Sequence, residues 1–137
     1  MVSKVITATT IGLNAHKIEV EVDFVNSQPG IVIVGLPDIA VNEARERVRS
    51  AVKNSDFSFT YQKVVVNLAP ADIRKEGTNF DLPIAIGILV ENGYIEQDRV
   101  NNTAFLGELS LDGALRGVNG VLPLVSGLKD FGIKSGK

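Results

Sequence analysis

Residues 30–38 read GIVIVGLPD, a wholly apolar run followed by a proline and an aspartate. A short uninterrupted apolar run is typical of a strand that is buried on both faces, so we expect residues 30–35 to form a central strand. Asp38 is the expected N-cap of a helix that follows directly. A strand that leads into a helix in this way indicates a domain of the α/β class.

The helix that begins at Asp38 is predicted to have one apolar face. Its apolar side chains recur at steps of three and four residues, at Val41, Ala44, Val48, Ala51 and Val52. Glu43 precedes Arg47 by four residues, which makes a favourable surface pair. We expect this helix to end near residues 54–56 and a further buried strand to cover residues 63–68.

Upstream of residue 30, two segments alternate between apolar and polar residues, as half-buried strands do. They cover residues 5–10 and 18–24, and residues 12–16 between them are predicted to form a hairpin loop. Downstream, residues 69–80 have no period and many polar groups, which indicates a loop that is long for a compact domain.

Asp81 is expected to cap a second helix, because it follows this loop and precedes an apolar segment. The later elements are predicted in this order: a helix from about Asp81 to residues 92–93, a strand at 103–106, a hairpin at 107–116 that turns at Asp112 and Gly113, and a last helix at 121–131.

The composition is that of one globular domain and excludes several classes of protein. The chain has 137 residues, of which 45% are hydrophobic and 22% charged, and its net charge is −2, so no global basic field gathers nucleic acid. It has no cysteine, which excludes disulfide scaffolds, cysteine-ligated metals and cysteine nucleophiles. We interpret the single histidine, His16, as incidental. The longest apolar run, residues 82–90, is too short for a membrane helix, which needs about 20 residues, and we expect a cytoplasmic protein.

The polar loop is the first candidate site. Four carboxylates in or near this loop could form an oxygen-rich site for a hard cation. They are Asp72 and Glu76 in the loop, and Asp81 and Glu108 outside it. Arg74 and Lys75 could instead bind phosphate. The alternative is a solvated loop followed by a helix cap. No metal-ligand spacing is matched, and Ile133 stands where a phosphate-binding loop requires lysine, so we assign no metal or cofactor to this chain.

The second candidate site is a basic stripe on the first helix. Arg45, Arg49 and Lys53 advance by four residues and lie along one slowly drifting line, with Arg47 beside it. Such a stripe could contact nucleic acid or an acidic partner subunit. Glutamates on the same helix partly neutralise the stripe, and the alternative is an ordinary exposed face.

Several separate motifs follow one another along the chain. They are PGIVIVGLPD at 29–38, EARERVRSA at 43–51, VNLAPAD at 66–72, KEG at 75–77, FDLPIA at 80–85, LGEL at 106–109 and LRGVNGVLP at 115–123. In this order they resemble the N-terminal domain of the magnesium-chelatase-like AAA+ ATPases of the YifB/ComM type, over nearly the whole chain.

This resemblance implies both a fold and a larger protein. The family's N-terminal domain is similar to the proteolytic domain of Lon proteases and to the second domain of ribosomal protein S5, which implies a two-layer α/β (α+β) sandwich with a mixed sheet and helices on one face. Residues 1–137 would form a single domain, followed in full-length members by an AAA+ module that binds ATP and magnesium. The ComM branch is implicated in DNA branch migration as a hexameric helicase.

The resemblance to Lon also bears on catalysis. Residues 107–113 resemble the Gly-Glu-Ile/Leu-x-Leu-x-Gly stretch of Lon, and this register places Asp81 where Lon has its nucleophilic serine and Leu122 where Lon has its general-base lysine. Neither side chain can perform that role, which implies that the peptidase chemistry is absent. Asp81 is then either a helix cap, which we favour, or an acidic group in the former active-site groove near Lys75 and Arg116.

The resemblance therefore predicts a non-catalytic assembly or substrate-engaging domain of an AAA+ ATPase that acts on DNA. Its partners would be the AAA+ module of the same polypeptide, neighbouring subunits and DNA, with no membrane. The candidate contact residues are Arg45, Arg49, Asp72, Arg74, Lys75, Glu76, Asp81, Glu108 and Arg116. The alternatives are a Lon-type peptidase with a displaced nucleophile at Ser110 or Thr78, and a small metal- or phosphate-binding module.

Overall fold

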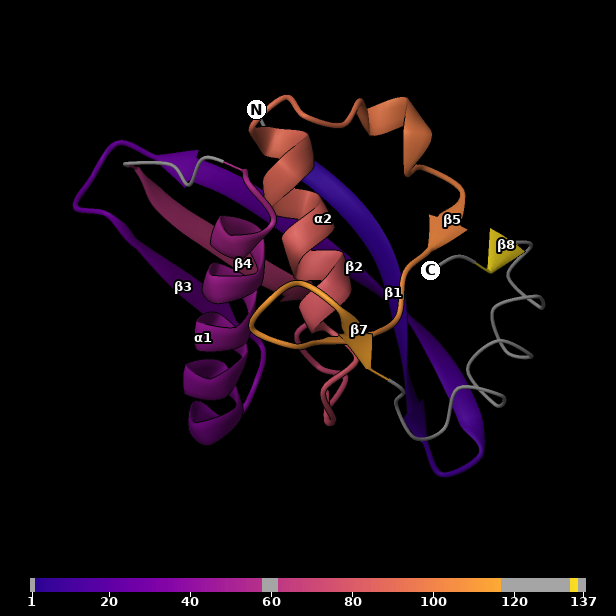
Figure 1. The fold of residues 1–137 in the computed structure, drawn as a ribbon. Helices are drawn as coiled ribbons and strands as arrows, with labels where there is room; N and C mark the ends of the chain where they lie inside the picture. Colours follow the sequence, from indigo (N-terminus) through magenta and orange to yellow (C-terminus); the bar gives the residue numbers. More distant parts are fainter. Residues whose placement is uncertain (1, 58–61, 117–133, 136–137) are drawn as a thin grey trace.

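The computed structural model describes residues 2–57, 62–116 and 134–135. These residues form one main sheet, a separate hairpin and the helices that cover the sheet (Figure 1). In chain order the elements are β1 (Ser3–Ile11), β2 (Asn14–Val25), β3 (Gly30–Val34), α1 (Asp38–Asn54), β4 (Lys63–Ala69), α2 (Asp81–Glu91), the 3-10 helix η1 (Gln97–Arg99), β5 (Thr103–Ala104), β6 (Glu108–Leu109), β7 (Leu115–Arg116) and β8 (Lys134–Ser135).

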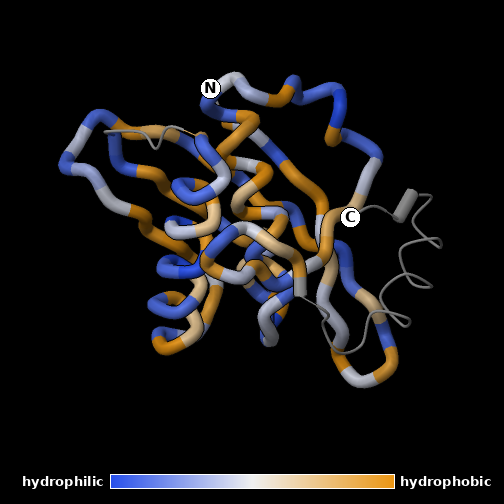
Figure 2. The backbone as a smooth tube through the Cα atoms, viewed as in Figure 1, coloured by the Kyte–Doolittle hydropathy of each residue, from blue (hydrophilic) through white to orange (hydrophobic). Residues whose placement is uncertain are grey.

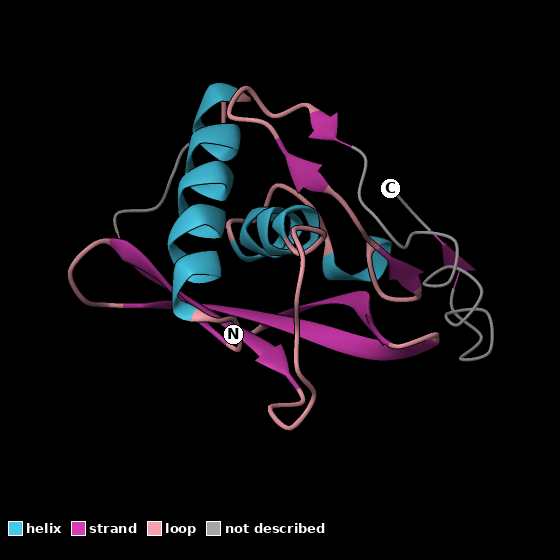
Figure 3. Cartoon of the chain, turned by 90° about the horizontal axis from the view of Figure 1, so that it is seen from below, coloured by secondary structure: helices cyan, strands magenta, loops and turns pink. Residues whose placement is uncertain are grey.

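The main sheet is mixed and carries both α-helices on one side (Figure 3). In the described part of the chain its strands lie in the order β3-β4-β2-β1-β5-β8. β2 is antiparallel to both β1 and β4, whereas β3 with β4, β1 with β5 and β5 with β8 are parallel pairs. The predicted two-layer arrangement, a mixed sheet with helices on one face, is therefore confirmed.

The core fills the space between the sheet and the two helices. Within residues 18–22 of β2 and throughout β4, every second residue points toward the helices and is fully buried, including Val20 and Val66. α1 contributes Val48 and α2 contributes Ile88, both also fully buried. Figure 2 shows the hydrophobic stretches of α2 and of the strands next to it. The period of two in the strands and of 3.6 in the helices thus places one apolar face of each element in a common core.

The apolar face predicted for α1 is confirmed, but its cap is not. Ala44, Val48, Ala51 and Val52 are buried. Pro37 occupies the N-cap position with an extended backbone, and the N-cap makes no side-chain hydrogen bond. The helix therefore starts at Asp38, one residue earlier than a capping role would require, and the prediction of Asp38 as N-cap was wrong.

The prediction that residues 30–35 form a central strand was also wrong. β3 pairs with β4 alone and lies at the edge of the sheet in the described part of the chain. Ile31 and Ile33 are buried against the helices, whereas Val32 and Val34 on the other face are 40% and 52% exposed. The apolar run was expected to be buried on both faces, but the helices of the described residues cover only one face of this sheet.

Two further boundaries differ from the expectation. The β1–β2 hairpin closes through the two residues Gly12 and Leu13, so residues 14–16 belong to β2 rather than to a loop. Gly12 has a φ of 62°, which a glycine adopts without strain and which suits such a short turn. β5 covers only Thr103 and Ala104, whereas the hairpin at 107–116 is confirmed as β6 and β7. The helix predicted at 121–131 lies outside the described residues.

A buried hydroxyl in β1 yields a prediction about stability. Thr7 is fully buried, and its Oγ1 has no hydrogen-bond partner among the described residues. Since an unpaired buried hydroxyl costs about 1–3 kcal/mol, Thr7→Val should stabilise the domain by about 1 kcal/mol. Urea unfolding followed by circular dichroism measures this, with Thr10→Val on the same strand as the control. A loss of stability in Thr7→Val would contradict the prediction.

Candidate functional site

Asp81, the first residue of α2, is the centre of the most strongly connected polar site in the described chain. Its side chain is 1% exposed. Arg47 from α1 binds it with two bonds, as Nε donates to Oδ2 at 2.6 Å and Nη2 donates to Oδ1 at 3.2 Å. The backbone N–H of Leu109 in β6 donates to Oδ2 at 3.1 Å. One carboxylate thus joins both helices to the β6–β7 hairpin.

The electrostatics of this site follow from its burial. Burial raises the pKa of Asp81 above its ordinary value of 3.8, and the bonds from Arg47 and from Leu109 N–H offset part of that rise. The hydrogen bond to Asp81 raises the pKa of Arg47, so the guanidinium stays charged. The neighbouring carboxylate of Glu108 raises both pKa values further. Asp81 is therefore a buried acid whose negative charge is stabilised mainly by Arg47.

The interpretation of Asp81 as a helix cap was wrong. Phe80 is the N-cap residue of α2, and no side chain caps the helix. The negative charge still lies in the first turn, where the helix dipole favours it. The side chain, however, points to α1 and β6, and its oxygens accept hydrogen bonds from Arg47 and from the Leu109 N–H.

Arg47 was not predicted from the sequence as the partner of this acid. A surface pair with Glu43 was expected instead, and that contact is present only as a long one of 4.0 Å. One signal was available, because Arg47 lies three residues after Ala44 and four residues before Ala51, a spacing that places it beside the apolar face of the helix. The side chain is accordingly only 20% exposed.

The polar loop before α2 does not gather its charges at one point. Lys75 is 2% exposed and its ammonium donates to the carbonyl of Pro70. Burial lowers the pKa of Lys75, and the carboxylate of Asp72 opposes this effect. Arg74 and Glu76 form an exposed ion pair at 2.7 Å. The two bases proposed to bind phosphate together are thus in different environments, one exposed and one buried.

The carboxylates proposed for a cation site are likewise separated. Asp72 and Glu76 are exposed, whereas Asp81 is buried with Arg47. Glu108 is half-buried beside the Arg47–Asp81 pair. Within residues 2–57, 62–116 and 134–135, no group of three or more acidic or histidine side chains is arranged to hold a metal ion.

The basic stripe divides into two kinds of residue. Arg45 is half-buried, and its guanidinium donates to the carbonyl of Ile31 at 3.3 Å and to the side chain of Asn42. It therefore covers a carbonyl of the edge strand β3. Arg49 and Lys53 are exposed. Only these last two present their charge to the surface as the sequence predicted.

The remaining candidates are placed as follows. The Ser110 hydroxyl bonds to Asp112 and to the Ala114 carbonyl inside the hairpin turn. Thr78 is half-buried in the loop before α2, and His16 is half-buried in β2. Arg116 ends β7, but its side chain lies outside the described part of the chain, as does Leu122.

The described residues form a two-layer α+β domain in which a buried carboxylate, at the start of the second helix, is bound by an arginine of the first helix. The model of a protein family described as subunit ChlI of Mg-chelatase matches residues 20–135. The chain belongs to this magnesium-chelatase-like family.

Relatives of the ComM and YifB type place the chain within the family. It is 45% identical over 121 residues to the competence protein ComM of Haemophilus influenzae, a match that covers 88% of this chain and 24% of that protein. It is 46% identical over 116 residues to YifB of Salmonella typhimurium and to YifB of Escherichia coli, covering 85% of this chain and 23% of each. The chain thus spans about a quarter of the length of these relatives.

None of the described helices is both long and apolar enough to cross a membrane.

Proposed function

We propose that this chain is a non-catalytic assembly or substrate-engaging domain of a larger magnesium-chelatase-like AAA+ ATPase, and that the full-length protein acts on DNA as an ATP-driven branch-migration helicase. The family and the quarter-length match to ComM support a role as one part of a larger protein. ATP and magnesium would bind the AAA+ module. The partners of the domain would be that module, neighbouring subunits and DNA.

The observation that carries the non-catalytic part of this proposal is the state of Asp81. The resemblance to Lon places this residue at the nucleophile position, and its carboxylate is instead bound by Arg47 and by Leu109 N–H. A carboxylate so bound is not exposed to a substrate. The position is used to join three elements of the fold rather than to attack a peptide bond.

Reversal of one exposed charge tests the contact surface. Arg49→Glu in the full-length protein should lower DNA-stimulated ATP hydrolysis or subunit assembly by about fivefold to tenfold, because it replaces an attraction with a repulsion. Arg49 is the suitable residue because it is exposed, whereas reversal at Arg45 would also break a bond to β3. Glu46→Gln, at an exposed position of the same helix, is the matched control. Unchanged assembly and unchanged DNA stimulation in Arg49→Glu would show that the stripe is only a solvated face.

A covalent probe tests the absence of peptidase chemistry. A serine-directed fluorophosphonate should leave the intact mass of the chain unchanged. An adduct at Ser110 or Thr78 would contradict the non-catalytic role and favour a displaced nucleophile. Denatured chain serves as the control for non-specific labelling.

A further inference from the structure

The β1–β2 hairpin extends beyond the sheet as an arm, which we define as residues 10–17, since Ala8 and Thr9 at its base are buried and Asn79 donates a hydrogen bond to the Ala8 carbonyl. β4 pairs with β2 only from Glu19 onward, and β5 pairs with β1 only at Ile6. Among the described strands, the residues of the arm therefore pair only within the β1–β2 hairpin. Figure 1 shows the end of this hairpin projecting from the body of the domain.

The tip of the arm is apolar and uncovered. Leu13, in the two-residue turn, is 90% exposed, and Ile11 beside it is 48% exposed. A side chain this exposed makes almost no contact within its own chain. Exposed apolar groups at the end of a projecting hairpin form a protrusion that can be buried only against another surface.

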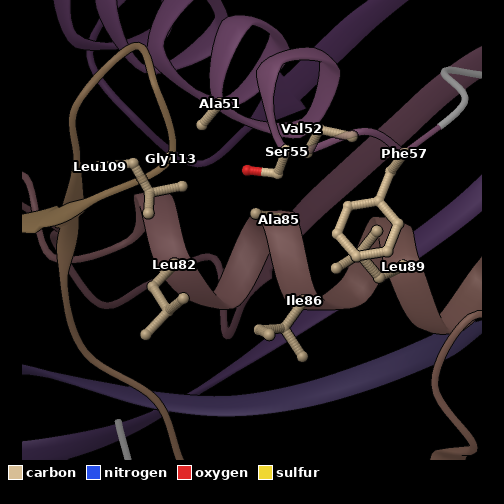
Figure 4. A pocket seen from close by; sticks show the side chains of 10 residues that line it. All are labelled: Ala51, Val52, Ser55, Phe57, Leu82, Ala85, Ile86, Leu89, Leu109 and Gly113. Carbon is tan, nitrogen blue, oxygen red and sulfur yellow. The ribbon is translucent and has the colours of Figure 1, made fainter.

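An apolar pocket of about 110 Å³ opens on the helix side of the domain (Figure 4). It lies between the C-terminal end of α1, the outer face of α2 and the β6–β7 hairpin, and its lining includes Ala51, Ser55, Leu82, Ile86, Leu109 and Gly113. The hydroxyl of Ser55 is the polar side-chain group among the labelled residues. An apolar cavity of roughly 150 Å³ holds a molecule as large as benzene, so this pocket suits one branched aliphatic side chain.

We propose that Leu13 at the tip of the arm of one copy inserts into this pocket of a second copy. The pocket is lined by apolar groups and the arm presents an aliphatic one. Charge also favours the contact, because Lys17 is exposed on the arm, while Asp56, between two residues that line the pocket, is exposed at its rim. Leu13 does not fill the pocket of its own chain, since it is almost fully exposed.

The contact is head-to-tail. The arm and this pocket lie on different surfaces of the chain, so each copy can contact two neighbours through them, and such contacts build rings or filaments rather than closed pairs. The inference rests on the proposed assembly role, because it identifies one contact through which the domain would assemble. Its test concerns contact between copies of this chain alone and is independent of ATP hydrolysis and DNA.

Site-directed crosslinking tests the contact. Because the chain has no native cysteine, each variant carries a single thiol at the chosen position. Asn14→Cys chain, which keeps Leu13 at the tip of the arm, should form a covalent dimer with Ser55→Cys chain when a short bismaleimide is added. The matched control replaces the arm variant with Ser27→Cys, an exposed position in the β2–β3 loop. We expect at least about fivefold more dimer from the arm variant, since a specific contact raises the local concentration of the two thiols. Equal yields in the two mixtures would overturn the proposal.

A complementation experiment tests the direction of the contact. Leu13→Glu has an intact pocket and Ile86→Glu an intact arm, so each alone should self-associate about tenfold more weakly than the original chain, because a charge enters an apolar contact. Mixed, they should form a one-to-one complex that grows no further, measured by sedimentation velocity. If Ile86→Glu fails to fold by circular dichroism, Ser55→Glu at the exposed rim replaces it. Failure of the mixture to associate more than either variant alone would overturn the proposal.

Discussion

Arg47→Met should destabilise the domain by about 3–5 kcal/mol at neutral pH. The substitution leaves the carboxylate of Asp81, which is 1% exposed, without its partner, and a buried charge that loses its partner costs this much. Urea unfolding followed by circular dichroism measures the effect, since the chain has no tryptophan to report by fluorescence. Arg49→Met on the same helix is the matched control, because Arg49 is exposed and its change should stay within about 0.5 kcal/mol.

The loss in Arg47→Met should depend on pH in a defined direction. Burial already raises the pKa of Asp81 in the folded chain, and removal of the guanidinium takes away an opposing effect, so the folded pKa rises further. The pKa of Asp81 is higher in the folded chain than in the unfolded chain, where it is near 3.8. Such an acid lowers the stability of the fold as the pH rises through the folded pKa, and it has no effect at a pH below the unfolded pKa. Acidification from neutral pH should therefore reduce the difference between Arg47→Met and the original chain. A difference that is constant with pH would contradict this account.

Gly87→Ala should destabilise the domain by about 1–2 kcal/mol, although alanine is the better helix former. A Cβ built at Gly87 would lie 2.6 Å from Cγ2 of Val22, at the place where α2 packs against β2. Overpacking of this kind costs about 1–3 kcal/mol, and occasionally more, against the gain of about 1 kcal/mol in helix propensity. The hydroxyl of Ser3 donates to the Gly87 carbonyl at 2.9 Å, so the helix also has little freedom to move away. Urea unfolding measures the loss.

A double-mutant cycle separates this clash from other effects. Val22→Ala alone removes buried methyl groups and should cost about 2 kcal/mol or more. Combined with Gly87→Ala, it removes the atom that the new methyl group meets. The loss of stability in the double variant should therefore be smaller than the sum of the two single losses by about 1 kcal/mol or more. Additive losses would show that the close approach at Gly87 does not limit the packing.

Much of the fold was predictable because its signals are local. The alternation in residues 18–24 and the three- and four-residue steps from Val41 to Val52 predicted β2 and α1, since each pattern reports which face of one element is apolar. The turn at Asp112 and Gly113 was predictable for the same reason, and Gly113 has the positive φ of 96° that favours glycine. The motifs that resemble the YifB/ComM type led to the family that the comparison confirms.

The candidate site was predicted only in part. Asp81 was selected as an acidic residue at the start of a helix, yet its role depended on a partner 34 residues away in the chain. Lys75 was expected to offer its charge to a ligand, but its ammonium is turned to the carbonyl of Pro70. In both cases the residue type identified a polar group, while burial and the nearest partner decided what that group does.

Local sequence patterns were enough to predict most of the elements and, for β2 and α1, the face that each one buries, because apolar periodicity and turn residues act within a few residues of chain. The packing in three dimensions was needed to show that β3 lies at an edge, that Arg47 reaches Asp81, and that the arm projects with Leu13 exposed. Strand order and charge pairing depend on which distant segments meet across the core, and a local pattern carries no information about that meeting.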